Sequence, residues 1–385
     1  MAGTFHQIAE VLRSTQRAAI EVENAPEKRK RLRTFSMPEA ATLLGVPQKV
    51  LRAAVGAPGR PAPPRLSFDD LQRARSALGA RRHLGASQQR LPTVVFTNFK
   101  GGSAKTTSSV HFAQYMALAG YRVLLVDLDS QGSATAQFGL DPATEVLRAN
   151  SFAAWTHARD AGVPIPGGTL CQPTYWPTIS LVPAGAALAE AEESLSRRAV
   201  SGEPEAVLYF EELEVFLASV AGQFDLAVVD TRPDVNMLMT AALHAATGII
   251  VPTRATMTDL ASTGEFFSHL AGYVSDFQAG FGKALGLVFS KILVSAYDPS
   301  DRSQEALLEL LRDRFGDAVL ASPFLNSRVM GTAGFGKETL YEYEPTTDRA
   351  AYNRVLASAN AVNRAIEQEL TKAASLAAVA REGVA

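Results

Sequence analysis

The chain has 385 residues, enough for a large domain and a smaller one, and 47% of them are hydrophobic, as in an ordinary soluble protein. No stretch approaches the roughly 20 apolar residues of a membrane span, and no apolar signal segment precedes the first helix pattern, so we expect a cytoplasmic protein. The single cysteine, Cys171, excludes internal disulfides and cysteine-rich metal sites.

The net charge of −2 conceals a division along the chain. Residues 1–90 hold 16 Lys and Arg against 7 Asp and Glu, a net charge of +9, whereas the other residues hold 21 against 32. This basic N-terminal region, the front of the chain, precedes an acidic remainder, and the division predicts that the front binds a polyanion such as DNA. A solvated basic arm without a partner is the alternative.

The first segment has apolar residues at roughly helical spacing, which predicts an amphipathic helix over residues 4–23. Because this helix precedes any plausible core, a dimerisation helix and a packing arm are equally good interpretations. A run with five Lys and Arg follows at residues 28–33 and either lies along phosphates or is a solvated linker. We assign residues 1–34 to the helix and this linker.

Residues 35–55 carry the pattern of two short helices joined by a tight turn. Ser36 and Glu39 have the spacing of a capping box, which begins the first helix. Gly45 makes the turn, and Pro47 opens the second helix. A helix, a short turn with glycine and a second helix form the helix-turn-helix pattern of DNA-binding proteins.

A loop rich in proline follows at residues 56–64, and Ser67 then starts another capped helix. We assign residues 35–90 to a winged helix-turn-helix-like DNA-binding domain, with an ordinary helical hairpin as the alternative. The residues expected to contact DNA lie on the second helix and around the loop: Gln48, Lys49, Arg52, Arg60 and Arg65.

A strand pattern at residues 93–98 leads into paired glycines, and Lys105 then opens an amphipathic helical pattern that ends at Gly120. Strand, glycine loop and helix follow in the order that a phosphate-binding loop requires. The loop and the helix N-terminus together point N–H groups at one anion. We therefore expect an ATP site, in which Lys105 lies along the β- and γ-phosphates and the Thr106 hydroxyl ligates Mg²⁺. The expected nucleotide-binding residues are Lys100, Gly101, Gly102, Ser103, Ala104, Lys105, Thr106 and Thr107.

Two further apolar strand patterns, at residues 122–127 and 224–231, run into the carboxylates Asp127 and Asp230. Such unalternating apolar runs between helices predict a parallel sheet that is covered on both faces. Asp230 would hold Mg²⁺ through water and hydrogen-bond to Thr106. A buried strand that ends in a structural aspartate is the alternative.

The remaining patterns continue the alternation of strands and helices. Strands are expected at 178–182, 248–252 and 285–294, and helices at 151–158, 186–198, 208–220, 258–275, 302–315 and 348–370. The predicted fold is α/β: a doubly wound, mostly parallel sheet of the P-loop NTPase type, preceded by a small helical helix-turn-helix domain. The ATPase domain would span residues 91–370, and residues 371–385 would form a tail.

The segment that begins at Lys100, Lys-Gly-Gly-x-x-Lys-Thr, resembles the deviant Walker A motif of the ParA/MinD ATPases, whose usual form is KGGxGKT. Within that family the chain is most similar to the RepA proteins of RepABC plasmid cassettes and to large ParA proteins with an N-terminal helix-turn-helix domain. Ala104 replaces a glycine of the motif, and Ser130 replaces the proline of the family's DxDPQ segment. Both departures leave the rate of hydrolysis open.

The resemblance implies roles for individual residues. Lys100 would reach across a dimer interface to the nucleotide of the partner subunit, beside Lys105 of the subunit that binds it. Asp129 would orient the attacking water, and the metal site would comprise Thr106, Asp127 and Asp230. ATP and Mg²⁺ are the implied cofactors, and a homodimer with weak ATPase activity is the implied active species.

The resemblance also implies a function: a plasmid or chromosome partition ATPase. Its ATP-bound dimer would bind nucleoid DNA without sequence preference, with Arg328, Lys337 and Arg354 as candidate contacts. A ParB/RepB-type centromere-binding protein would stimulate hydrolysis, and the front domain would repress the chain's own operon. The tail lacks the basic amphipathic anchor of MinD, so no membrane partner is expected. A MinD-like membrane-cycling ATPase and an ATP-gated repressor without turnover remain as alternatives.

Overall fold

The computed structural model describes residues 30–56, 62–84, 90–201, 204–330 and 338–382, and residues 3, 4, 7, 10, 11 and 14 of the N-terminal segment. The chain divides into two compact units, Met1–Leu32 and Arg33–Ala385. Most of the helix predicted over residues 4–23 falls outside the described residues, as do the DNA-contact candidates Arg60 and Lys337.

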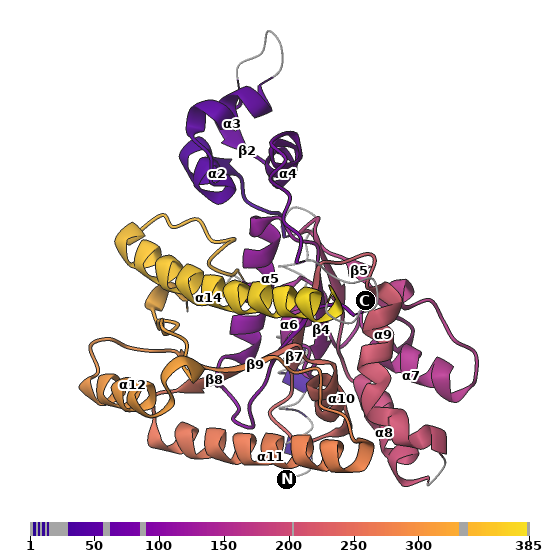
Figure 1. Cartoon of the computed structure of the whole chain (residues 1–385). Helices are drawn as coiled ribbons and strands as arrows, with labels where there is room; N and C mark the ends of the chain where they lie inside the picture. Colours follow the sequence, from indigo (N-terminus) through magenta and orange to yellow (C-terminus); the bar gives the residue numbers. More distant parts are fainter. Residues whose placement is uncertain are drawn as a thin grey trace. The chain divides into compact units, whose positions relative to one another are not determined.

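The larger unit begins with a small group of helices and a two-stranded ribbon (Figure 1). The predicted capping box of Ser36 with Glu39 is present, and Gly45 makes the turn with a φ of 67°. Ser67 caps the next helix as predicted, and it does so in a capping box with Asp70. The predicted helix, turn and helix are therefore confirmed. The elements are β1 (Phe35–Ser36), α2 (Met37–Leu44), α3 (Gln48–Val55), β2 (Arg65–Leu66) and α4 (Phe68–Ala77).

A seven-stranded sheet forms the centre of the following domain, in the order β5-β6-β4-β7-β3-β8-β9. Neighbouring strands are parallel, except that β5 pairs antiparallel with β6. The predicted doubly wound, mostly parallel sheet is confirmed. The strands are β3 (Thr93–Phe96), β4 (Val123–Leu128), β5 (Gln172–Pro173), β6 (Ile179–Val182), β7 (Leu226–Thr231), β8 (Gly248–Arg254) and β9 (Phe289–Ser295).

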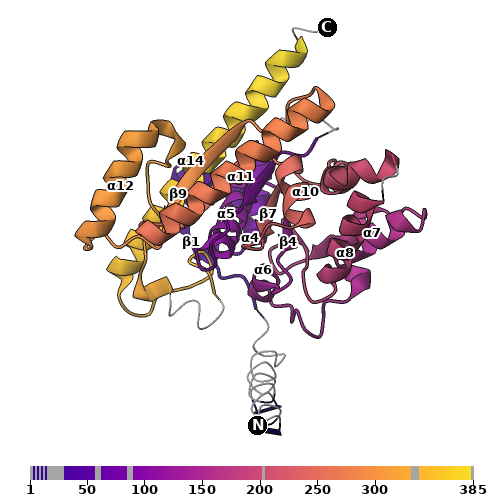
Figure 2. The ribbon, with the colours of Figure 1, turned by 90° about the horizontal axis from the view of Figure 1, so that it is seen from below.

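Helices cover both faces of this sheet. On one face the ring of Phe112 in α5 lies 5.8 Å from that of Phe96, and α14 crosses the outer side of α5 (Figure 1). On the other face α8 to α11 pack against Val95 and Val229. Figure 2 shows α7 and α8 at one edge of the sheet and α12 at the other. The α-helices are α5 (Lys105–Ala119), α6 (Ser133–Gln137), α7 (Phe152–Asp160), α8 (Leu188–Val200), α9 (Glu212–Val220), α10 (Met237–Ala245), α11 (Met257–Phe281), α12 (Arg302–Phe315) and α14 (Arg349–Glu382). Short 3₁₀ helices are η2 (Arg148–Asn150), η3 (Gly167–Leu170), η4 (Pro204–Glu211) and η5 (Gly316–Ala318).

Several element boundaries differ from the prediction. The last helix continues past Leu370 to Glu382, because the added residues are mostly alanine and other good helix formers. The helix expected over 208–220 is a 3₁₀ helix as far as Glu211 and α-helical only afterwards. The short helices α6 and α10 were not predicted. No helix within the described residues is long and apolar enough to span a membrane.

The prediction that α5 is amphipathic is wrong, because α5 is buried on nearly every side. Its polar side chains bond to other parts of the domain instead of water. The amide nitrogen of Leu340 donates to Nε2 of His111 at 3.1 Å, and Nε2 of Gln114 donates to Glu342 at 3.0 Å. Burial lowers the pKa of His111 to about 4, so this ring is neutral and accepts the hydrogen bond from Leu340.

Candidate active site

Three neighbouring strands bring the predicted site residues to one edge of the sheet. In the parallel register Asp230 of β7 stands opposite both Phe96 of β3 and Asp127 of β4. The phosphate loop follows β3 directly, so it lies beside the two aspartates. The carboxyl ends of strands are where open α/β sheets bind their ligands.

The loop has the backbone expected of a phosphate cradle. Gly102 has a φ of 71°, and Ala104, the N-cap of α5, has a φ of 67°. An L residue in this left-handed conformation costs about 1–2 kcal/mol, which explains why glycine is usual at the position of Ala104. No side chain caps the N-terminus of α5. Its first N–H groups therefore face the loop without a side-chain partner, as an anion site requires.

Buried hydrogen bonds fix this loop to the neighbouring strands. Nδ2 of Asn98 donates to the carbonyl of Pro252 at 2.8 Å and to Oγ1 of Thr263 at 3.1 Å. The Ser295 hydroxyl donates to the carbonyl of Ser103 at 2.8 Å. All these side chains are buried or nearly so, and the loop is therefore held in one geometry before a ligand arrives.

The two lysines of the motif, Lys105 and Lys100, differ in their burial and in their hydrogen bonds. Lys105 is only 7% exposed, and its Nζ donates to the carbonyl of Lys100 at 3.0 Å, so its side chain folds back over the loop. Burial lowers the pKa of Lys105, and the negative charges of Asp230 and Asp129 oppose this. Lys100 is half-buried, and its amide nitrogen, rather than its side chain, is held by Asn98.

Asp127 and Asp230 are both fully buried but differ in their contacts. Asp127 accepts hydrogen bonds from the amide of Asp129 at 3.0 Å and from the amide and hydroxyl of Thr135 at 2.9 and 2.7 Å. Burial raises its pKa to about 6, which these hydrogen bonds partly offset. Asp127 therefore holds the segment that follows β4 in place.

Asp230 has no such support. Burial, reinforced by the charge of Asp127, raises its pKa well above the usual range, while Thr106 and Lys105 lower it. Neither of its oxygens has a hydrogen bond of ordinary geometry within the described residues. A buried carboxylate without a partner is costly. A hydrated Mg²⁺ between Asp230 and the Thr106 hydroxyl fits this arrangement, because both are the oxygen donors that Mg²⁺ prefers.

Asp129 lies at the mouth of the site and is half-buried. Its Oδ1 accepts from the amide of Gln131 at 2.9 Å, which closes the turn after β4. The turn tightens at Gly132, which has a φ of 62°. The expected role of Asp129 in orienting the attacking water stays a prediction.

The DNA-contact candidates lie elsewhere. Gln48, Lys49 and Arg52 are exposed on α3, and Arg328 and Arg354 are exposed far along the chain. Arg65 is exposed too, but its guanidinium donates to Thr34 and to Glu344, the latter at 2.6 Å. A DNA contact by Arg65 would compete with this ion pair.

Several residues that shape the site were not among the predicted site residues. Thr135 and Ser295 fix Asp127 and the loop, and Arg254, the last residue of β8, carries an exposed side chain beside Gly102. Their positions depend on the order of strands in the sheet. A signal for Arg254 was present, since it follows a predicted parallel strand by two residues.

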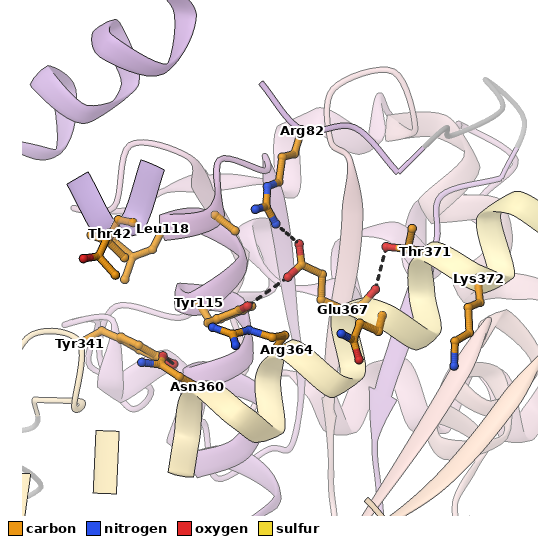
Figure 3. A pocket seen from close by; sticks show the side chains of 13 residues that line it. Thr42, Arg82, Tyr115, Leu118, Tyr341, Asn360, Arg364, Glu367, Thr371 and Lys372 are labelled. Atoms are coloured by element: carbon orange, nitrogen blue, oxygen red, sulfur yellow. Dashed lines mark hydrogen bonds and ion pairs between the residues drawn. The ribbon is translucent and has the colours of Figure 1, made fainter. Parts of the chain in front are cut away.

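A cavity of about 630 Å³ lies between α2, the C-terminal half of α5 and α14 (Figure 3). Glu367 is its central charged group and accepts hydrogen bonds from Tyr115, Tyr121 and Arg82 at 2.7–3.1 Å. Leu118 also lines it, about 20 Å along the helix from Lys105 at a rise of 1.5 Å per residue. The cavity is therefore separate from the phosphate loop.

Known proteins resemble this chain in both sequence and fold. A family model described as an AAA domain matches residues 92–281. A putative replication protein A of Rhizobium rhizogenes is 32% identical over 90% of this chain and 89% of its own length. The chromosome-partitioning ATPase Soj of Thermus thermophilus is 31% identical over 68% of this chain and 92% of its own length. A solved partition protein has the same fold, with a TM-score of 0.65 at 16% identity over 97% of this chain and 98% of that one. The chain belongs to the ParA family of partition ATPases.

Proposed function

We propose that this chain partitions plasmid or chromosome copies by cycling between an ATP-bound dimer and a form released by hydrolysis. Membership of the ParA family gives it an ATPase domain, which implies ATP hydrolysis. The observation that carries the proposal is the buried carboxylate of Asp230, which has no hydrogen bond of ordinary geometry within the described residues and lies beside a glycine-bearing loop. Such an arrangement suits Mg²⁺ and a nucleoside triphosphate together.

Within one subunit, the amides from Gly101 to Thr107 would bind the phosphates, and Lys105 would lie along them after leaving its contact with the carbonyl of Lys100. Thr106 and Asp230 would hold Mg²⁺, which would neutralise part of the phosphate charge. Asp129 would orient the attacking water. Phosphoryl transfer of this type depends on positioning and charge more than on covalent chemistry.

A second subunit would complete the site through Lys100, whose contacts within the described residues are made by its backbone amide and carbonyl. Its side chain would neutralise charge on the nucleotide of the partner subunit. The γ-phosphate would then tie two subunits together, and its loss would release them. This account predicts a homodimer that forms with ATP and separates after hydrolysis.

The dimer would bind nucleoid DNA through phosphate contacts, with Arg328 and Arg354 as exposed candidates and Lys337 as a candidate outside the described residues. A ParB/RepB-type partner would stimulate hydrolysis. The basic front would bind the operator of its own operon, and the exposed face of α3 with Lys49 and Arg52 supports this role.

The decisive experiment is a titration of purified protein with a fluorescent ATP analogue, with and without Mg²⁺. We expect Mg²⁺-dependent binding that Asp230→Asn abolishes. A chain that shows no Mg²⁺-dependent affinity for adenine nucleotides would refute the proposal.

Three further measurements test its parts. DNA binding with ATP, ADP and no nucleotide at several salt concentrations counts the phosphate contacts through the salt slope. Lys100→Ala tests the cross-subunit role: ATP-dependent dimerisation equal to that of the parent would contradict it. Turnover with and without DNA and the partner protein measures how far Ala104 and Ser130 slow hydrolysis.

A further inference from the structure

Strand β8 continues beyond its pairing with β3 and runs alongside the phosphate loop. The last residue of β3, Phe96, stands opposite Ile250, and β8 extends four residues further to Arg254. Six of its seven residues are buried, and only the side chain of Arg254 is exposed. This places one arginine at the edge of the sheet where the phosphate loop begins.

The guanidinium of Arg254 lies against Gly102, the second glycine of the loop. A Cβ atom built on Gly102 would stand 3.2 Å from Nη2 and 3.9 Å from Cζ of Arg254. The backbone N–H groups of this part of a P-loop cradle the phosphates. A guanidinium in contact with Gly102 is therefore within reach of an anion bound there.

The backbone that carries Arg254 is fixed to the loop. The Ser295 hydroxyl lies 2.8 Å from the carbonyl of Ser103 and 3.2 Å from that of Thr253, and so bridges the two segments. The Thr263 hydroxyl donates to Oγ1 of Thr253 at 2.9 Å, and Thr253 is fully buried. Arg254 is thus the last residue of a strand whose end is held in a fixed position relative to the loop by buried hydrogen bonds.

The charge of Arg254 has no acidic partner within the part of the chain that the structure describes; no ion pair or side-chain hydrogen bond involves it there. The aspartates of the site lie on the other side of β3, because the sheet order places β7 and β4 on one side and β8 on the other. Carboxylates for a metal therefore flank the loop on the β7 side, and a free guanidinium flanks it on the β8 side.

We propose that Arg254 contacts the polyphosphate of the bound nucleotide from the β8 side, as a third cation beside Lys105 and the partner subunit's Lys100. The inference rests on the proposed function, since it needs a nucleoside di- or triphosphate on the loop. A guanidinium suits this role because its planar fork donates two parallel hydrogen bonds to phosphate oxygens.

The test compares the full-length parent with Arg254→Ala, Arg254→Lys and the control Arg314→Ala, which removes an exposed cation from α12. The dissociation constants of ATPγS, ADP and inorganic pyrophosphate are measured with Mg²⁺ by calorimetry or by displacement of a fluorescent nucleotide. We expect Arg254→Ala to weaken all three by about 10- to 100-fold, as for the loss of a hydrogen bond to a charged group. The affinities of Arg254→Lys should lie between those of the parent and Arg254→Ala, and the affinities of Arg314→Ala should equal those of the parent.

Pyrophosphate decides which part of the nucleotide Arg254 contacts. Loss of affinity for pyrophosphate supports a phosphate contact, whereas loss confined to ATPγS and ADP would assign Arg254 to the nucleoside and overturn the proposal. Unchanged affinity for all three ligands would overturn it as well. Because the side chain is exposed, the melting temperature without ligand should match that of the parent, and Arg254→Gln repeats the test if Arg254→Ala does not fold.

The outcomes separate this inference from the function on which it rests. If the parent binds ATPγS with Mg²⁺ and Arg254→Ala binds equally well, only the role of Arg254 is wrong. If the parent itself fails to bind, the proposed function is wrong.

Discussion

Replacing Asp230 by asparagine should stabilise the protein without ligand while removing its response to Mg²⁺ and nucleotide. Asp230 is fully buried, stands opposite Asp127 in the sheet register and has no hydrogen bond of ordinary geometry to either oxygen in the described chain. Asparagine has nearly the same shape and no charge. The substitution therefore removes the repulsion by Asp127 and the cost of a buried charge, which outweigh the lost attraction to Lys105 and Thr106.

The magnitude follows from the neighbouring carboxyl group. Burial raises the pKa of Asp127 from 3.8 to about 6, roughly two units, and one unit corresponds to about 1.4 kcal/mol. Burial raises the pKa of Asp230 in the same direction, well above the usual range, and a buried polar group left without a hydrogen bond costs about 1–3 kcal/mol. We expect Asp230→Asn to add about 1–3 kcal/mol at pH 7.5, which raises the melting temperature by about 2–6 °C.

The pH dependence gives a second signature. A carboxyl group whose pKa is raised by folding favours the folded state below its unfolded pKa, near 4, and this contribution is lost as the pH rises through its folded-state pKa. The advantage of Asp230→Asn over the parent should therefore be small at pH 4 and grow as the pH rises through the folded-state pKa of Asp230, which burial raises well above the usual range.

Thermal unfolding with and without ATPγS and Mg²⁺ measures both effects. At 100 times its dissociation constant the ligand should stabilise the parent by about 2.7 kcal/mol and the variant hardly at all. Asp225→Asn is the matched control: burial opposes ionisation there too, but hydrogen bonds from Arg122 lower the pKa of Asp225, so this variant should be less stable than the parent. If Asp230→Asn melts below the parent without ligand at pH 7.5, the carboxylate makes stabilising contacts and the reasoning is wrong.

Three further substitutions test single contacts by urea denaturation. Ala104→Gly should stabilise the chain by up to about 1 kcal/mol, because glycine adopts a φ of 67° without strain; a loss of stability would contradict this. Gly120→Ala should cost about 2–3 kcal/mol, because its Cβ would lie 2.6–2.9 Å from Arg75 and its φ is 108°; the loss should shrink in an Arg75→Ala background. Glu342→Gln should cost about 2 kcal/mol, because the side-chain NH₂ group of glutamine cannot accept the hydrogen bond that the amide of Thr339 donates to Oε2 of Glu342 at 2.9 Å; equal stability would show that this bond contributes nothing.

The features that sequence alone could predict are those with local signals. Paired glycines after an apolar strand and before Lys105 define the loop, and an apolar run that ends in Asp127 or Asp230 defines a strand with its carboxylate at the sheet edge. Capping pairs such as Ser36 with Glu39 are also local signals, because both partners lie within one helical turn, and they predict where a helix begins.

The remainder depends on contacts between distant segments. The register that sets Asp127 opposite Asp230 joins strands about a hundred residues apart, and no periodicity within either strand reports it. The outer face of α5 is polar in sequence, with His111 and Gln114, yet it is buried because residues near Leu340 and the last helix cover it. Amphipathicity assumes that polar residues face water, and here they face other parts of the protein.

The distribution of unfavourable features within the domain argues for a ligand independently of any motif. Within the described part of the chain, the buried side-chain oxygens of Thr97, Ser103 and Asp230 have no hydrogen-bond partner of ordinary geometry, and all three residues lie at the carboxyl edge of β3 and β7. Ala104 takes a strained φ at the same place, and the N-terminus of α5 has no side-chain cap. Each feature lowers the stability of the folded chain, and a fold without a ligand to bind gains nothing by gathering them at one edge. Each also corresponds to one part of a metal nucleotide: the carboxylate to Mg²⁺, and the turned loop with its free amides to phosphate oxygens. The energetic cost and the binding chemistry therefore coincide at the same residues.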